Sequence, residues 1–96
     1  MHAVMRTYSG QDAVALMDLL ERNKTAVEQT LRGVDGFVSY ALVRTADGGF
    51  SLSVYRDKAG ADASVRVARE WTARNATHLK AAPPTVAEGA VILQLS

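Results

Sequence analysis

The side chains best suited to chemistry in this 96-residue chain lie on one face of a predicted helix in its second half. Residues 54–78 contain the only tryptophan, and at about 100° per residue one side of the helix carries Ser64, Ala68, Trp71, Asn75 and His78. An indole can stack on an aromatic ligand, an amide can orient it and an imidazole can transfer a proton. This face is therefore predicted to line either the core or a ligand pocket.

Further candidates lie on predicted strands. Arg6 and Tyr8 share one face of a first strand at residues 3–8, and Tyr40 lies on a second strand. In a pocket, Arg6 would stabilise an anionic oxygen, while Tyr40 or His78 would transfer protons. A structural role stays open for each candidate, with Trp71 in the core and His78 in an exposed connection. Asn75 would then cap a helix end, and Arg6 would face solvent.

A first helix is predicted from Ala13 to about Arg32. Its apolar residues recur at helical spacing, and Ser9 or Asp12 is expected to cap its start. Gly33 is expected to end it in the left-handed conformation. Lys24 lies within the apolar stripe, so its charge would have to reach water past the edge of the sheet.

The middle of the chain predicts a β-hairpin. Residues 37–44 and 50–56 alternate in polarity around the turn sequence Asp47-Gly48-Gly49. On the return strand Phe50, Leu52 and Val54 are expected to face the helices. Ser51, Ser53 and Tyr55 would then face a second sheet or a cavity.

The remaining elements complete a βαββαβ order. Asp57 is expected to cap a helix over residues 58–76, Pro83 and Pro84 exclude further helix, and residues 86–95 predict a last strand with a possible bulge at Gly89. This order is typical of a ferredoxin-like α+β fold, a four-stranded antiparallel sheet with two helices on one face. The uncovered face would meet solvent, a ligand or a partner sheet.

Composition narrows the function classes. The chain has no cysteine, which removes thiol nucleophiles and thiolate metal sites, and two histidines without well-placed carboxylates predict no metal centre. A net charge of +1 without a basic patch argues against nucleic acid as a partner. Without an export signal or a long apolar run, we expect a cytoplasmic protein that does not enter a membrane.

The segment GFVSYALVRTADGGFSLSVYRDKAGADASVRVAREW, residues 36–71, resembles the antibiotic biosynthesis monooxygenase-like proteins of the dimeric α+β barrel superfamily. Its most characteristic features are the strand start at residues 36–40, the strand exit at Asp57 and the spacing of Ser64, Ala68 and Trp71. The resemblance extends over nearly the whole chain and implies a single domain of this type at residues 1–96. It also implies a homodimer whose sheets pair into a barrel, with a pocket between sheet and helices in each subunit.

The resemblance also implies an activity. Some members oxygenate polycyclic aromatic substrates without metal or flavin, so no cofactor is expected, and related proteins bind and degrade haem. Trp71 matches the tryptophan of the haem-degrading relatives and His78 is the nearest candidate for their histidine. However, the first strand AVMRTY lacks their asparagine, and His78 follows Trp71 at a shorter interval.

Two hypotheses follow. The chain is either a cofactor-free monooxygenase acting on a small aromatic molecule or a non-catalytic dimeric barrel that binds a ligand. In the enzyme reading, catalysis would use His78, Tyr40 and Arg6, and substrate binding would use Trp71, Asn75 and Ser64.

Overall fold

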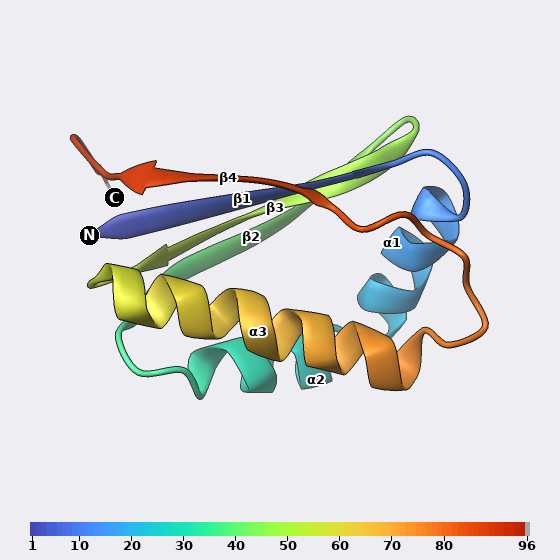
Figure 1. Ribbon diagram of the computed structural model, residues 1–96, viewed down its shortest axis with the longest axis horizontal. Coiled ribbons are helices and arrows are strands. Elements are labelled where there is room, and N and C mark those ends of the chain that lie inside the picture. Colours follow the sequence, from blue (N-terminus) through green and yellow to red (C-terminus); the bar gives the residue numbers. More distant parts are fainter. Residues whose placement is uncertain (96) are drawn as a thin grey trace.

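One antiparallel sheet forms the upper layer of the computed structural model, which describes residues 1–95. Its strand order is β2-β3-β1-β4. The strands are β1 (His2–Ser9), β2 (Phe37–Thr45), β3 (Gly48–Tyr55) and β4 (Thr85–Ala90). The helices are α1 (Ala13–Arg22), α2 (Lys24–Arg32) and α3 (Lys58–Asn75). All three helices lie on the same side of the sheet (Figure 1), so the ferredoxin-like prediction is confirmed.

The predicted first helix is in fact two helices. The chain breaks at Asn23, whose backbone N–H and side-chain amide both donate to the Leu19 carbonyl oxygen, at 3.1 and 2.8 Å. Asparagine competes for backbone acceptors in this way, which favours a helix end over a helix interior. Because α2 takes a new direction, Lys24 is exposed at its first position and no longer lies within a buried stripe.

The predicted helix ends are only partly correct. The carboxylate of Asp57 accepts a 2.9 Å hydrogen bond from the Gly60 N–H, as expected of a cap on α3. Asp12 stands at the start of α1 with φ 62° but makes no capping bond there. Gly33 ends α2 in the right-handed conformation, and the left-handed glycine of this connection is Gly36, at φ +86°.

The faces of the sheet are reversed relative to the prediction. The alternation on β3 is present, but Ser51, Ser53 and Tyr55 face the helices and are buried. The apolar Leu52 pairs with Met5 on β1, and both are exposed on the open face, at 43% and 38%. Alternation shows that the two faces of a strand differ, whereas only the packing of the helices decides which face is inside.

The last strand is shorter than predicted. β4 ends at Ala90, the Val91 N–H still donates a 2.9 Å hydrogen bond to the Met1 carbonyl oxygen, and the chain then leaves the sheet (Figure 1), with Ile92, Leu93 and Leu95 exposed. Gly89 pairs in register with Ala3, so no bulge occurs there. The predicted hairpin is confirmed, but its turn is Ala46-Asp47, because Thr45 pairs with Gly48 and both glycines belong to β3.

The core between sheet and helices has two apolar parts. The larger part surrounds Leu16, Met17 and Trp71, and the smaller one contains Val4, Tyr55 and Ala61. Four buried polar residues accompany them, namely Arg6, Ser51, Ser53 and Ser64. Along β1, Arg6 lies between Val4 of the smaller part and Tyr8 of the larger part, so a charged group interrupts the core where sheet and helices meet.

No helix within residues 1–95 is both long and apolar enough to cross a membrane.

Candidate functional site

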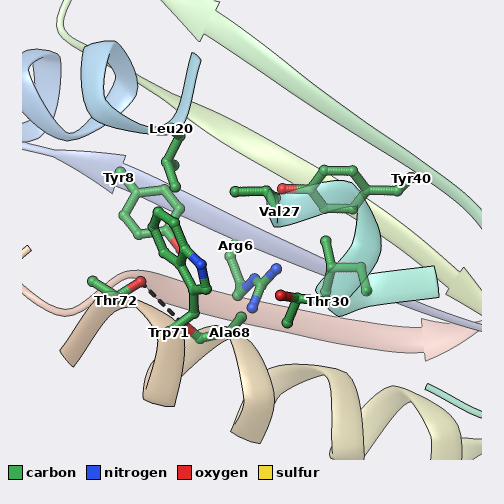
Figure 2. A pocket seen from close by; sticks show the side chains of 10 residues that line it. Arg6, Tyr8, Leu20, Val27, Thr30, Tyr40, Ala68, Trp71 and Thr72 are labelled. Carbon is green, nitrogen blue, oxygen red and sulfur yellow. Dashed lines mark hydrogen bonds between the residues drawn. The ribbon is translucent and has the colours of Figure 1, made fainter. Parts of the chain in front are cut away.

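A small inner cavity lies between the sheet and helices α2 and α3 (Figure 2). Its volume is about 30 Å³, which is room for roughly two molecules the size of water. Its polar lining includes Arg6, Tyr8, Tyr40, Trp71 and Thr72, and Leu20, Val27 and Leu31 supply apolar walls. Three residues singled out from the sequence, Arg6, Tyr40 and Trp71, therefore meet at one site although they come from β1, β2 and α3.

Arg6 is the central side chain of this site (Figure 2). It is 4% exposed, and its Nε donates a 3.3 Å hydrogen bond to Ser51 Oγ on the neighbouring strand. Within residues 1–95 no carboxylate pairs with it, and neither cavity described here is lined by an Asp or a Glu. A guanidinium is always charged in a protein, so the site contains a buried positive charge without a counter-ion.

The two tyrosines of the site are held in their neutral form. Burial raises the pKa of Tyr8 and of Tyr40, and the nearby charge of Arg6 offsets only part of this effect. At neutral pH both phenols therefore carry their proton and can donate hydrogen bonds. Tyr40 is suited to stabilising an anionic oxygen and unsuited to acting as a base.

A larger outer cavity lies on the other side of Arg6. Its volume is about 360 Å³, within the range of small-molecule sites. It shares Arg6, Tyr8, Ala68 and Thr72 with the inner cavity, so these residues form the wall between the two. Its other walls come from α3, including Val65 and Arg69, and from residues 81–84 of the connection between α3 and β4.

This connection is fastened to the start of α1. The backbone N–H of Lys80 donates a 2.7 Å hydrogen bond to Asp12 Oδ2, and Leu79 and Ala81 pack against the larger part of the core. Pro83 and Pro84 follow in the outer cavity wall. Asp12 thus positions one wall of the outer cavity instead of capping a helix.

Three predicted site residues lie outside both cavities. Ser64 is fully buried and donates a 2.6 Å hydrogen bond to the Ala61 carbonyl oxygen within its own helix. Asn75 donates to the Trp71 carbonyl oxygen at 2.9 Å, at the last position of α3. His78 is exposed beyond the helix end, because α3 stops at Asn75 and the predicted helical face does not extend that far.

Little in the sequence indicated the remaining wall residues. Thr30 and Thr72 have ordinary polar side chains at helical positions, and each donates to a carbonyl oxygen one turn earlier, at 2.9 and 3.0 Å. The segment Ala81-Ala82-Pro83-Pro84 is small, apolar and rigid, and this composition was the one sign that the connection could cover a cavity.

The histidines do not contribute to either cavity. His2 lies at the start of β1, 2.8 Å from Glu88 on β4, and His78 is exposed. In the described part of the chain, no cluster of three or more His, Asp or Glu side chains is placed to hold a metal ion.

Comparison with known proteins gives matches of structure only. No protein-family model matches the sequence, and no curated protein matches it.

Three solved structures show how widely the architecture is shared. Rv0793 from Mycobacterium tuberculosis has 26% sequence identity and a TM-score of 0.64, over 99% of this chain and 97% of that one. The haem degrader MhuD, also from M. tuberculosis and solved with two haems in its active site, has 15% identity and a TM-score of 0.70, over 100% of both chains. A monooxygenase from the ActVA-Orf6 gene of Streptomyces coelicolor, in complex with nanaomycin D, has 20% identity and a TM-score of 0.59, over 97% of this chain and 91% of that one.

Further matches include two dimeric ferredoxin-like proteins from uncultured marine organisms, at 13% and 10% identity. The fold is thus that of the dimeric ferredoxin-like proteins. Within that class, the matches with monooxygenase and haem-degrading proteins support the antibiotic biosynthesis monooxygenase-like resemblance seen in the sequence.

Proposed function

We propose that this chain binds a small aromatic or polycyclic molecule between its sheet and helices and oxygenates it without a cofactor. The observation that carries the proposal is the convergence of Arg6, Tyr40 and Trp71 on one cavity that adjoins a larger one. The solved monooxygenase with nanaomycin D has the same fold and supports a polycyclic ligand.

Oxygenation of this kind requires few catalytic groups from the protein. Oxygenation without a cofactor requires a substrate that can itself pass an electron to O2, so the protein has to orient that substrate, stabilise its anion and exclude water. The outer cavity is large enough for the substrate, and the inner cavity has room for roughly two molecules the size of water. Arg6 lines both cavities and would bind the substrate's anionic oxygen, and the neutral Tyr40 would donate to that oxygen from the inner cavity, where Trp71 closes the site against the apolar core.

Haem degradation is not proposed. Haem is normally held through an axial side chain, often a histidine, and no histidine lines either cavity. A tyrosine can also ligate haem iron as its phenolate, but burial raises the pKa of Tyr8 and of Tyr40 and so keeps both phenols protonated. The structural similarity to the haem degrader is therefore a similarity of fold.

The proposed assembly is a homodimer through the open face of the sheet. Met5, Val43 and Leu52 are exposed there, at 38%, 38% and 43%, and two dimeric proteins share the fold. Exposed apolar groups gathered on one face are typical of an interaction surface. The exposed side chains of the segment 91–95 continue from the neighbouring edge strand and would add apolar area to the contact.

The single tryptophan gives a direct test. Trp71 fluorescence is titrated with polycyclic phenols and quinones, corrected for inner-filter absorption, and O2 consumption is then measured with each compound that binds. We expect saturable quenching by one compound class together with O2 consumption. The Tyr40→Phe variant should turn over about 100-fold more slowly because it loses a hydrogen-bond donor to the developing anion.

His78→Ala is the matched control, because His78 lies outside both cavities and its loss should leave turnover unchanged. Binding without O2 consumption would reject the oxygenase proposal and favour a ligand-binding protein. The absence of quenching across the whole panel would reject the site itself.

A further inference from the structure

Within residues 1–95, no side chain that could act as a base lines either cavity. Their walls carry no Asp, Glu or His, and the tyrosines that line them have pKa values raised by burial. A substrate that depends on the protein for its deprotonation would find no acceptor for the proton. An anionic ligand of these cavities must therefore already be ionised when it binds.

The positive charge of the site pairs with no carboxylate among the residues that the structure describes. Of the five N–H donors of the Arg6 guanidinium, only Nε–H has an acceptor within residues 1–95, and that acceptor is the neutral hydroxyl of Ser51. Among the side-chain polar atoms described, only Ser53 Oγ is both fully enclosed and unbonded. The Nη nitrogens of Arg6 are therefore accessible from the cavities that the residue lines.

A second arginine lies in the wall of the outer cavity. Arg69 on α3 is exposed, and no carboxylate pairs with it in the described chain. The remainder of that wall is mostly apolar, from Leu16, Val65 and the 81–84 segment. The outer cavity thus combines an apolar interior with positive charge at its inner wall and its exposed side.

We propose that the ligand enters as an organic anion, with a planar anionic group on the Arg6 guanidinium and an apolar aromatic body in the outer cavity. A carboxylate suits the two Nη donors best, because a guanidinium binds it through two parallel hydrogen bonds. The inference rests on the proposed function only for the location of the ligand. It specifies the substrate class as an aromatic carboxylate.

The test compares two ligands of the same shape. Naphthoate and naphthamide, which differ in charge, are titrated into the protein by calorimetry, with naphtholate at alkaline pH as a third probe for a phenolate head. We expect naphthoate to bind at least about tenfold more tightly than naphthamide, as a charge-assisted pair requires. Naphtholate binding more tightly than naphthoate would overturn the assignment of a carboxylate.

The Arg6→Met variant distinguishes a role of Arg6 in ligand binding from a role in protein stability. Arg6→Met should abolish the preference for naphthoate. It should also raise the melting temperature of the free protein, by about 5 °C, because an unpaired buried charge is removed. If Arg6 had only a structural role, Arg6→Met would instead lower the melting temperature and would weaken the binding of naphthoate and naphthamide equally.

Arg74→Gln is the matched control, since it removes the same charge from an exposed position on α3 outside both cavities. It should leave the preference and the melting temperature unchanged. An equal loss of preference in Arg74→Gln, equal affinity of the wild type for both ligands, or no binding of either at millimolar concentration would overturn the proposal.

The two proposals fail differently. A preference for the anion without O2 consumption by any aromatic anion would leave this inference standing and reject the oxygenase. Turnover of a neutral aromatic compound without any preference for the anion would support the oxygenase and reject the anionic ligand.

Discussion

The tyrosines show how burial sets the chemistry of individual residues in this protein. Burial raises the pKa of all three, Tyr8, Tyr40 and Tyr55. Arg6 lowers each of them, but by less than burial raises it. The phenols of the site are consequently donors over the whole physiological pH range.

This effect predicts the alkaline titration of the protein. At pH 10, where about half of free tyrosine is ionised, the folded protein should show much less phenolate absorbance than the protein unfolded in urea. Folded tyrosines with raised pKa values retain protons that the unfolded chain loses. The stability from these groups is thus complete below pH 10 and declines as the pH rises further. Equal phenolate absorbance in the folded and unfolded states at pH 10 would contradict the prediction.

At the scale of elements, the connection between α3 and β4 acts as a wall of the outer cavity. Its position depends on the hydrogen bond from the Lys80 N–H to the Asp12 carboxylate, between residues 68 positions apart. Asp12 adopts φ 62°, which most side chains avoid but glycine accepts.

Asp12→Gly should therefore remove the hydrogen bond without straining the backbone. We expect the free energy of unfolding to fall by about 1 kcal/mol and the Lys80 amide to exchange faster with solvent, as measured by urea unfolding and hydrogen exchange. Asp12→Asn keeps an acceptor oxygen and tolerates the same φ, so it should stay close to the wild type. Unchanged exchange at Lys80 in Asp12→Gly would show that packing alone holds the connection.

The break between α1 and α2 is the second element that shapes the site. A single helix would have continued the direction of α1, whereas the break at Asn23 starts a second helix whose Val27, Thr30 and Leu31 line the inner cavity. Apolar spacing at about 3.6 residues continues through both helices, so periodicity alone could not reveal the change of direction.

For the whole molecule, the open face of the sheet predicts the oligomeric state. Leu52→Asp should convert the proposed homodimer into a monomer in sedimentation analysis, because it places a charge within an apolar contact. Val14→Asp is a matched control, since Val14 on α1 is similarly exposed, at 45% against 43%, but lies on the helical side. Circular dichroism should show that both variants are folded. A monomeric wild type, or a Leu52→Asp variant that is still dimeric, would contradict the proposed interface.

The sequence by itself determined the four strands, their order along the chain and the helical stretches between them, but not the division of the first stretch into α1 and α2. Alternation at period two located the strands, Asp57 marked the start of α3, and the order βαββαβ led to the ferredoxin-like sheet that the structure shows. These features depend on local hydrogen bonding and on side-chain direction along one element, and residues close in sequence control both. Arg6, Tyr40 and Trp71 could also be selected from their chemistry.

Only the tertiary structure decided which face of the sheet the helices cover and which side chains share a cavity. The helices pack on the face with Arg6, Ser51 and Tyr55, and this leaves Leu52 outside. That choice depends on how residues from four or more elements fill one volume, and no single segment contains this information. Ser64 and His78 were assigned to the site from the face of one helix, whereas the end of α3 and its packing placed them elsewhere.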